Sequence, residues 1–236
     1  MLAALFPLDT HPEQRPRSTS KLSEPYSVVR LDEVEAVPTF GKLKWKPLRR
    51  PLDVRAFGVN AYWAAESGDE LIEQHDELGA GAGKHEELYV VIGGSARFSV
   101  AGDEVDAPPG TVVFVRDPAA KRGAVATAAN TTALAVGGVR GEPYSVAPWE
   151  SVAHAIPSWE RGDYAEAKAM IAAGVERHPD NPSLLYNLAC VEALSGEAEP
   201  ALDHLRRALE FKPSLAEEAS SDEDFASIRD LPGFPA

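Results

Sequence analysis

The sequence predicts an α+β protein of two domains, an all-β barrel followed by an all-α helical domain. Two observations predict it. Between residues 56 and 139, turn-forming glycine, proline, asparagine and aspartate residues recur at short intervals, with no amphipathic helical pattern between them. Beyond residue 149, similar residues recur 34 positions apart. Short, evenly spaced strands are typical of a β-sandwich or barrel, and a 34-residue period is typical of a helical repeat.

The length of 236 residues is enough for one domain of ordinary size and a smaller one. Residues 1–22 are rich in proline, serine and charge, and we expect them to form a disordered leader. We expect residues 23–150 to form the barrel and residues 151–236 the helical domain.

Composition excludes several classes of function. The net charge of −14 argues against nonspecific nucleic-acid binding, which needs a cationic surface. No apolar run is long enough to cross a bilayer. The single cysteine, Cys190, excludes an intramolecular disulfide framework, and we expect it to be a buried, inert thiol. The sequence therefore predicts a cytoplasmic protein with no nucleic-acid or membrane partner.

Individual strands follow from alternating or β-rich runs bounded by turns. The run at residues 96–100 and the run at residues 104–106 flank Gly102, which predicts a hairpin. Six further runs have strand character, at residues 27–31, 43–48, 57–63, 70–77, 85–92 and 112–115.

The stretch from Glu70 to Gly94 concentrates the titratable residues. Strand side chains alternate faces, so His75 shares a face with Glu77 and His85 shares a face with Glu87. If the two strands pair antiparallel around the glycine-rich loop and these faces coincide, two imidazoles and two carboxylates converge. Such a set suits a divalent metal or acid–base chemistry. The alternative is a solvated acidic loop mouth.

This stretch and the one after it resemble the cupin family. Glu87 to Gly94 fits the end of the first cupin motif, and Gly110 opens a strand as in the second motif, after a Pro108-Pro109 turn. The resemblance covers about residues 26–149. It implies an RmlC-like jelly roll, the double-stranded β-helix, with a small-molecule site, and it implies a homodimer. Metal-dependent cupins further imply oxygenase, isomerase or lyase chemistry.

The metal ligands of the family are largely missing. Its His-x-His pair falls at Gly81 and Gly83, or at Ala80 and Ala82, and its third histidine falls near Lys121 or Arg122. Of the family set only Glu87 remains.

Two alternatives follow for the site. In one, the site is metal-free, and Arg116, Lys121 and Arg122 bind an anionic ligand, although these arginines could instead pair with nearby glutamates. In the other, a rearranged set holds one divalent ion of iron, manganese, nickel or zinc. That set consists of His75, Glu77, His85 and Glu87.

The helical domain resembles the tetratricopeptide repeat (TPR). Five pairs of residues carry the 34-residue period: Gly162 and Gly196, Asp163 and Glu197, Ala167 and Ala201, Ile171 and Leu205, and Pro179 and Pro213. Around residues 151–157 we expect Pro157 to interrupt the first helix, which leaves one full repeat, one partial repeat and a tail from Ser214. The resemblance implies a protein partner.

The leading expectation is therefore a cupin-type small-molecule-binding protein. A more specific version of this expectation adds a divalent metal and enzymatic activity. The alternative is a metal-free ligand sensor or scaffold whose TPR-like domain binds a protein partner.

Overall fold

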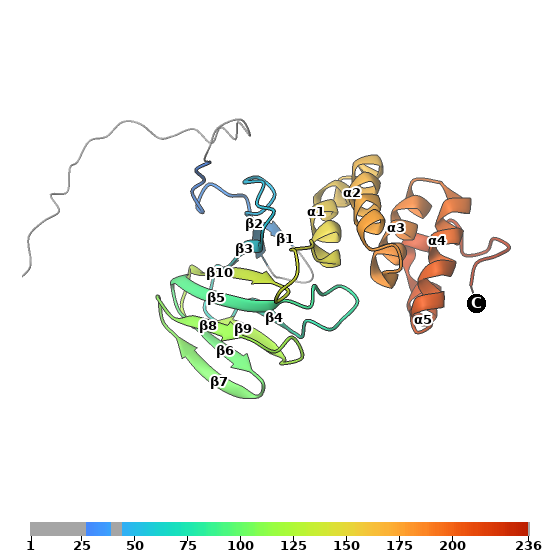
Figure 1. Cartoon of the computed structure of the whole chain (residues 1–236). Helices are drawn as coiled ribbons and strands as arrows, with labels where there is room; N and C mark the ends of the chain where they lie inside the picture. Colours follow the sequence, from blue (N-terminus) through green and yellow to red (C-terminus); the bar gives the residue numbers. More distant parts are fainter. Residues whose placement is uncertain (1–26, 39–43, 236) are drawn as a thin grey trace, which may run out of the picture.

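The computed structural model describes residues 27–38 and 44–235, in which strands precede helices along the chain (Figure 1). The leader expected at residues 1–22 lies outside the described residues. The strand expected at residues 27–31 does not form: residues 27–30 are irregular and residues 31–34 form a turn. The Arg30 guanidinium bonds the Asp32 carboxylate at 2.8 Å, and the Glu33 amide bonds the Arg30 carbonyl at 3.0 Å, so local contacts close this segment into a turn.

The strands build two antiparallel sheets, and the runs predicted from residue 43 onward fall on observed strands. The first sheet contains, in spatial order, β1 (Val37–Pro38), β2 (Lys44–Pro47), β3 (Gly58–Ala64), β10 (Thr131–Gly138), β5 (Glu86–Gly93) and β8 (Val112–Val115). The second sheet contains β4 (Glu70–His75), β9 (Arg122–Ala126), β6 (Ala96–Val100) and β7 (Asp103–Ala107).

From β3 to β10, eight strands are divided between the two sheets in the orders β3-β10-β5-β8 and β4-β9-β6-β7, and every connection crosses between the sheets except the β6–β7 hairpin. Eight antiparallel strands in two sheets with this crossing order form a jelly roll. The strands form two separate sheets rather than one closed sheet, so the predicted closure into a barrel stays a prediction. The predicted hairpin forms between β6 and β7, and positive φ angles at Ala101 and Gly102 make its turn.

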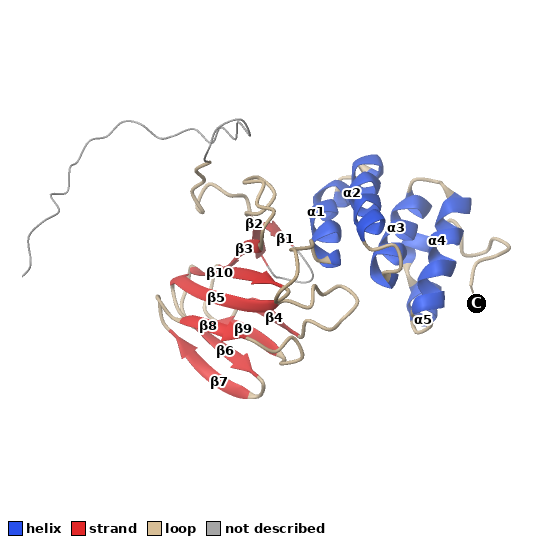
Figure 2. Ribbon diagram, viewed as in Figure 1, coloured by secondary structure: helices blue, strands red, loops and turns tan. Residues whose placement is uncertain are grey.

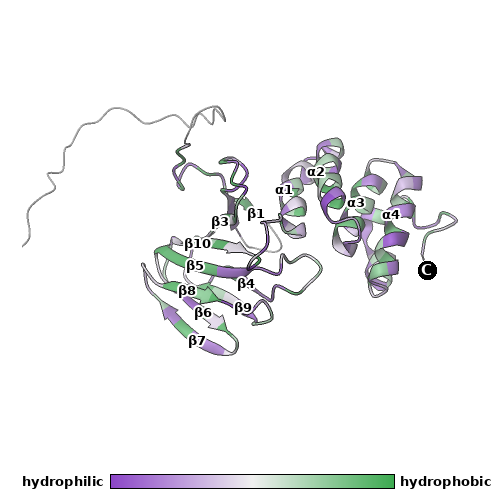
Figure 3. Ribbon diagram, in the orientation of Figure 1, coloured by the Kyte–Doolittle hydropathy of each residue, from purple (hydrophilic) through white to green (hydrophobic). Residues whose placement is uncertain are grey.

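The space between the sheets is filled by apolar side chains. Leu71, Tyr89 and Phe98 are buried at its centre, and the rings of Tyr89 and Phe98 lie 5.6 Å apart. Outside, β7 is exposed and largely hydrophilic (Figure 3). Apolar side chains therefore fill the middle of the sandwich, and a ligand site within it has room only near one end of the two sheets.

The chain changes from strand to helix between residues 138 and 148 (Figure 2). The helices that follow are α1 (Pro148–Glu160), α2 (Tyr164–Arg177), α3 (Pro182–Leu194), α4 (Ala198–Phe211) and α5 (Leu215–Ser221), with a 3-10 turn at Glu223–Phe225. The bounds of α1 and α2 recur 34 residues later as those of α3 and α4. None of the helices in the described part of the chain has the length and hydropathy needed to cross a membrane.

The expected break at Pro157 is wrong, because α1 continues through it to Glu160. Proline removes one backbone hydrogen bond, to the carbonyl of Ala153, but Val152 and Ala155 on the same helix are buried against α2 and α3, and this packing holds the helix together. The first helix pair is therefore as complete as the second.

The helical part rests on the sandwich through α1. The indole rings of Trp45 and Trp149 meet edge to face at 5.3 Å, and the Trp149 amide donates to the Gly81 carbonyl at 3.0 Å. Beside them the Arg49 guanidinium lies 2.6 Å from the Glu150 carboxylate, whose side chain is only 2% exposed. The first turn of α1 is thus held against the end of the jelly roll.

Candidate metal and ligand site

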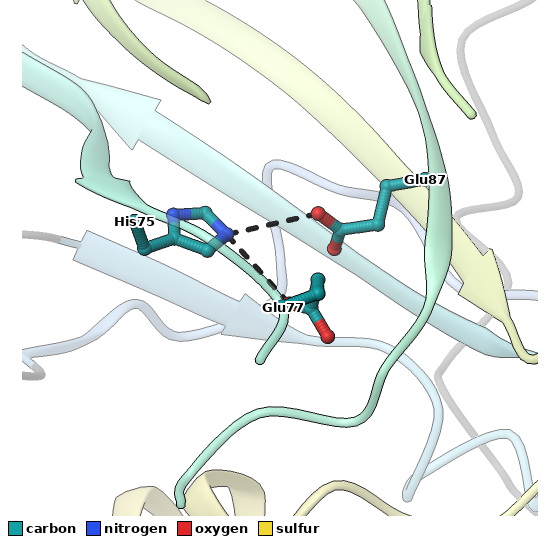
Figure 4. A group of neighbouring side chains, drawn as sticks. All are labelled: His75, Glu77 and Glu87. Atoms are coloured by element: carbon teal, nitrogen blue, oxygen red, sulfur yellow. Dashed lines mark ion pairs between the residues drawn. The ribbon is translucent and has the colours of Figure 1, made fainter. Parts of the chain in front are cut away.

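Three predicted residues converge at that end of the sandwich: His75, Glu77 and Glu87 (Figure 4). Their convergence does not come from a hairpin, since β4 and β5 belong to opposite sheets. His75 ends β4, Glu77 follows it in the loop, and Glu87 is the second residue of β5. The facing sheets bring the three together across the mouth of the sandwich.

The geometry of this cluster suits a shared cation. The Nε2 atom of His75 lies 3.7 Å from Oε1 of Glu77 and 3.7 Å from Oε2 of Glu87, and all three ligand atoms lie within 4.8 Å of one another. These distances are too long for hydrogen bonds. Two ligands that each lie about 2.1 Å from one metal ion are separated by about 3 to 4 Å.

The tautomer of His75 is settled by its backbone contact. Its Nδ1 atom lies 2.8 Å from the carbonyl oxygen of Glu73, which can only accept, so Nδ1 carries a proton. In the neutral ring the Nε2 lone pair then faces the two carboxylates. Metal-binding histidines are commonly oriented in this way.

The charge state of His75 depends on competing effects. Burial lowers the pKa of His75, but the Glu87 carboxylate and the Glu73 carbonyl outweigh burial, and the pKa ends above its ordinary value. Without a metal, His75 therefore keeps a proton on Nε2 up to a higher pH than an ordinary histidine does. A metal that binds here displaces that proton.

Glu77 is held by the glycine-rich loop. Its Oε2 atom accepts from the Gly83 amide at 2.9 Å and from the His85 amide at 3.2 Å, which leaves Oε1 directed toward His75. A Cβ atom at Gly83 would come within 2.4 Å of the His85 ring, so the loop closes this tightly only with glycine there. The sequence pattern does not predict this role of the loop, because it depends on backbone amides.

Glu87 is positioned by two neighbours. The Tyr89 hydroxyl donates to Oε2 of Glu87 at 2.5 Å, and Nε of Arg122 lies 3.4 Å from the same oxygen. Burial raises the pKa of Glu87, but His75, Tyr89 and the Arg122 charge together outweigh it, and the net effect lowers the pKa. Tyr89 was not predicted as a site residue, although the two-residue period of β5 places it on the same face as Glu87.

Arg122 lies inside the sandwich. It is directly opposite His75 in the β4–β9 ladder, is fully buried, and donates from Nη1 to the Pro118 carbonyl at 3.2 Å. Arg122 therefore pairs with Glu87 and does not form part of the cavity wall. Arg116 and Lys121, the other predicted anion ligands, are exposed, and the Arg116 guanidinium lies over the Phe114 ring.

His85, the fourth residue of the predicted metal set, does not join the cluster. Its ring packs 5.6 Å from the Tyr144 ring and lines a separate cavity of about 30 Å³. Its Nε2 atom is buried without a hydrogen-bond partner among the described residues. His85 is two residues from Glu87, and two residues of extended chain span about 7 Å. Because the His85 ring packs against Tyr144, it does not reach back toward Glu87.

A larger cavity of about 280 Å³ opens beside the cluster, between the sandwich and the helices. Its acidic wall comes from the sandwich, and four of its residues come from α1 and α3. The sandwich contributes Tyr62, Ile72, Glu73, His75, Asp76, Glu77 and Glu87 with loop residues, and the helices contribute Trp149, Val152, Ser183 and Asn187. The described lining contains no lysine or arginine.

A second group with metal-ligand atoms lies in the helical part, at Cys190, Asp222 and Asp224. Burial and these acids raise the pKa of the Cys190 thiol, and the thiol contacts Asp222 at 3.9 Å. The Tyr186 hydroxyl donates to the same Asp222 oxygen at 2.8 Å. These residues therefore form an internal hydrogen-bond network that ties α3 to Asp222 at the end of α5, and the buried thiol stays protonated.

In comparisons with known proteins, no family model and no curated protein matches the chain. Solved structures with similar folds include a predicted oxalate decarboxylase from Thermotoga maritima, with 19% identity and a TM-score of 0.38, covering 47% of this chain and 96% of that chain. An RmlC-like cupin from Shewanella frigidimarina has 21% identity and a TM-score of 0.38, covering 50% and 95%.

A third structure is a sugar phosphate isomerase of a cupin superfamily from Silicibacter pomeroyi, with 17% identity and a TM-score of 0.38, covering 47% of this chain and 74% of that chain. Each likeness spans about half of this chain and concerns the fold alone. The assignment of the N-terminal part as a jelly roll rests on its strand order.

Proposed function

We propose that this protein binds a small molecule at a divalent metal ion held by His75, Glu77 and Glu87. The observation that carries the proposal is the position of His75, whose Nε2 atom lies 3.7 Å from a carboxylate oxygen of each glutamate. Its other ring nitrogen is held by a backbone carbonyl. One nitrogen and two oxygens suit iron, manganese, nickel or zinc.

The charges around the cluster support a cation. The buried Arg122 pairs with Glu87, whereas Glu77 has no lysine or arginine partner among the described residues. Glu73 and Asp76 add further carboxylates to the wall of the same cavity. A divalent ion offsets this excess of negative charge.

His75, Glu77 and Glu87 would hold the ion with fewer protein ligands than its full coordination number, and the ion would supply Lewis-acid chemistry to a ligand in the cavity. The protein's own residues do the rest. Tyr89 and Arg122 hold Glu87, and the amides of the glycine-rich loop hold Glu77. Trp149 and Val152 line the cavity from the helical side.

The ligand differs from the anionic one expected from Lys121 and Arg122. The described cavity wall carries carboxylates, a serine and an asparagine beside apolar and aromatic side chains. An anionic group therefore finds its positive partner only in the metal, and the remainder of the ligand is neutral or cationic. Oxygenase, isomerase and lyase activities stay the reaction classes to screen.

Metal content tests this proposal. Protein purified without a metal-affinity tag is assayed for metals by elemental analysis, as isolated and after reconstitution with each of the four ions. We expect near-stoichiometric metal in the wild type and in His85→Ala, because His85 lies outside the cluster, and loss in His75→Ala. Wild-type protein that stays metal-free after reconstitution contradicts the proposal. Loss in both variants would restore the four-residue ligand set.

A second candidate function is protein binding by the helical part as a TPR-like module. The recurrence of both helices of a pair after 34 residues supports it. Asp203, His204 and Arg207 of α4 line an exposed hollow on this part. We expect Asp203→Ala with Arg207→Ala to release a partner that co-purifies with the full-length wild type, and unchanged co-purification argues against this surface.

A homodimer is proposed from the edge of the first sheet. β8 ends the sheet, and its Val112 and Phe114 side chains are 54% and 43% exposed on one face. An apolar edge strand is an expected pairing surface. Light scattering of the wild type and of Phe114→Asp tests it: we expect a dimer that becomes a monomer, and a monomeric wild type excludes it.

A further inference from the structure

We propose a second binding site, for a small phosphate-bearing anion, in a cavity of about 260 Å³ between the sandwich and the first helix pair. It is lined by three arginines and a histidine, although the chain as a whole carries a charge of −14. Its lining consists of Arg49, Arg50, Val146, Ser151, His154, Met170, Ala173 and Arg177. It stands independently of the metal site.

The two cavities use different faces of α1. Trp149 and Val152 line the acidic cavity, whereas Ser151 and His154 line the arginine cavity. At 3.6 residues per turn, the midpoints of these two pairs lie on nearly opposite sides of the helix. A ligand in one cavity is therefore separated from a ligand in the other by the helix itself.

The positive charge of the second cavity is only partly compensated. Arg49 is paired with Glu150, whose Oε1 atom lies 2.8 Å from Nε and 2.6 Å from Nη2 of the arginine. His154 also approaches Glu150, with Nε2 at 3.4 Å. Arg50 and Arg177 form no ion pair with any described residue, so about two positive charges remain available to an anion.

The contacts of these two arginines leave their guanidinium groups free to bind. Among the described residues, the one side-chain hydrogen bond of Arg50 is a weak one, from Nη1 to the sulfur of Met170 at 3.9 Å. Arg177 donates from Nη2 to the hydroxyl oxygen of Ser151 at 3.2 Å. The serine hydroxyl, itself a hydrogen-bond donor, therefore lies next to the guanidinium group. Guanidinium groups bind phosphate or carboxylate oxygens through two parallel hydrogen bonds.

The remaining lining selects among anions. Val146, Met170 and Ala173 form an apolar part of the wall, so an organic phosphate gains contacts that a bare inorganic ion lacks. Arg50 precedes β3, and Arg177 ends α2. A bound anion therefore connects the sandwich to the helical part, and it must stabilise their docking against unfolding.

Thermal unfolding and calorimetry of the full chain test the site, with inorganic phosphate and phenyl phosphate as probes and with chloride holding ionic strength constant. We expect phosphate to raise the unfolding temperature of the wild type, and phenyl phosphate to bind more tightly. In the double variant Arg50→Gln and Arg177→Gln we expect affinity to fall at least about tenfold. Both side chains are exposed, so the variant retains the fold.

Two controls keep the outcomes separate. Arg116→Gln removes an exposed arginine that lies over Phe114 rather than in the cavity, and it must leave phosphate binding unchanged. His75→Ala must also leave it unchanged, so failure of the metal site does not affect this test. Equal phosphate binding by the wild type and the double variant, or a shift reproduced by chloride, overturns the proposal.

Discussion

Two cavities flank α1, and they differ in the sign of their charge. The cavity at the mouth of the sandwich has four carboxylates, a histidine and aromatic walls. The cavity on the other side has three arginines and one histidine. Glu150, at the start of α1, binds Arg49 and limits the positive charge of the second cavity. The comparison shows that local lining, and not the net charge of −14, determines which ligand each cavity can hold.

The largest expected effect comes from Glu150→Ala, which removes the acid between the two cavities. Glu150 is buried and Arg49 is mostly so, and breaking such a pair leaves an uncompensated cation at a cost of about 3–5 kcal/mol of unfolding free energy. The freed Arg49 should strengthen phosphate binding. Urea unfolding measures the first effect and calorimetry the second. Glu160→Ala, at the exposed end of α1, is the matched control, and equal losses in both variants would refute the role of the pair.

Glu77→Gln should act on the acidic cavity alone. The amide oxygen can still accept from the loop, but the negative charge that faces His75 is lost. We expect affinity for manganese to fall about 100-fold, and phosphate binding to stay as in the wild type. Titration calorimetry with each ligand checks this, with Glu70→Gln at the exposed start of β4 as control. A loss of phosphate binding in Glu77→Gln would mean that the cavities are not independent.

Gly83→Ala should disturb the glycine-rich loop whose amides hold Glu77. The added methyl group meets the His85 ring, so the loop must shift, at a cost of about 1–3 kcal/mol in stability and about tenfold in metal affinity. Gly79→Ala is a close control, because a Cβ there meets no atom within 4 Å. Thermal unfolding and metal titration of both variants measure the difference. Identical behaviour of the two would show that the tight closure at Gly83 does not position Glu77.

The smallest expected effect is a pH dependence of stability at Glu150. Burial raises the pKa of Glu150, but His154 and Arg49 outweigh burial, and in the folded protein the pKa lies below its ordinary value of 4.5. The ionised group therefore stabilises the fold above pH 4.5. As the pH falls below 4.5 toward the folded pKa, the unfolded chain takes up the proton first, and this contribution is lost.

Comparison with Glu150→Gln isolates this term. The difference in unfolding free energy between the wild type and this variant should be constant near neutral pH and should shrink below pH 4.5. A difference that grows on acidification would mean that the sign of the shift is wrong. Denaturant titrations at several pH values decide between these outcomes.

The residues of the metal cluster could be selected from the sequence because strand alternation is a local property. His75 and Glu87 lie at the ends of β-rich runs, and their side chains point inward as the two-residue period requires. The antiparallel pairing that would have brought them together does not form, however, since β4 and β5 lie in different sheets. The same period put His85 on the face of Glu87, but it contains no information about which way a ring turns.

Arg122 shows the same limit. Its position near a missing ligand predicted an anion-binding wall, but its place opposite His75 in the ladder buries it beside Glu87. Which strands pair, and how deep a residue lies, depend on contacts between segments far apart in the chain. No local pattern records those contacts.

The order of the elements, strands before helices, follows from local patterns in the sequence. Turn residues predicted most of the strands, though not the turn at residues 31–34, and the 34-residue period predicted the second helix pair in full and the first in part, because turn and helix signals depend on neighbouring residues. Only the packed chain reveals that Trp149 lines the acidic cavity and that Arg50 and Arg177, which are 127 positions apart, line the same second cavity. Cavities form where distant segments pack, so their lining is a property of the packed chain rather than of any one stretch.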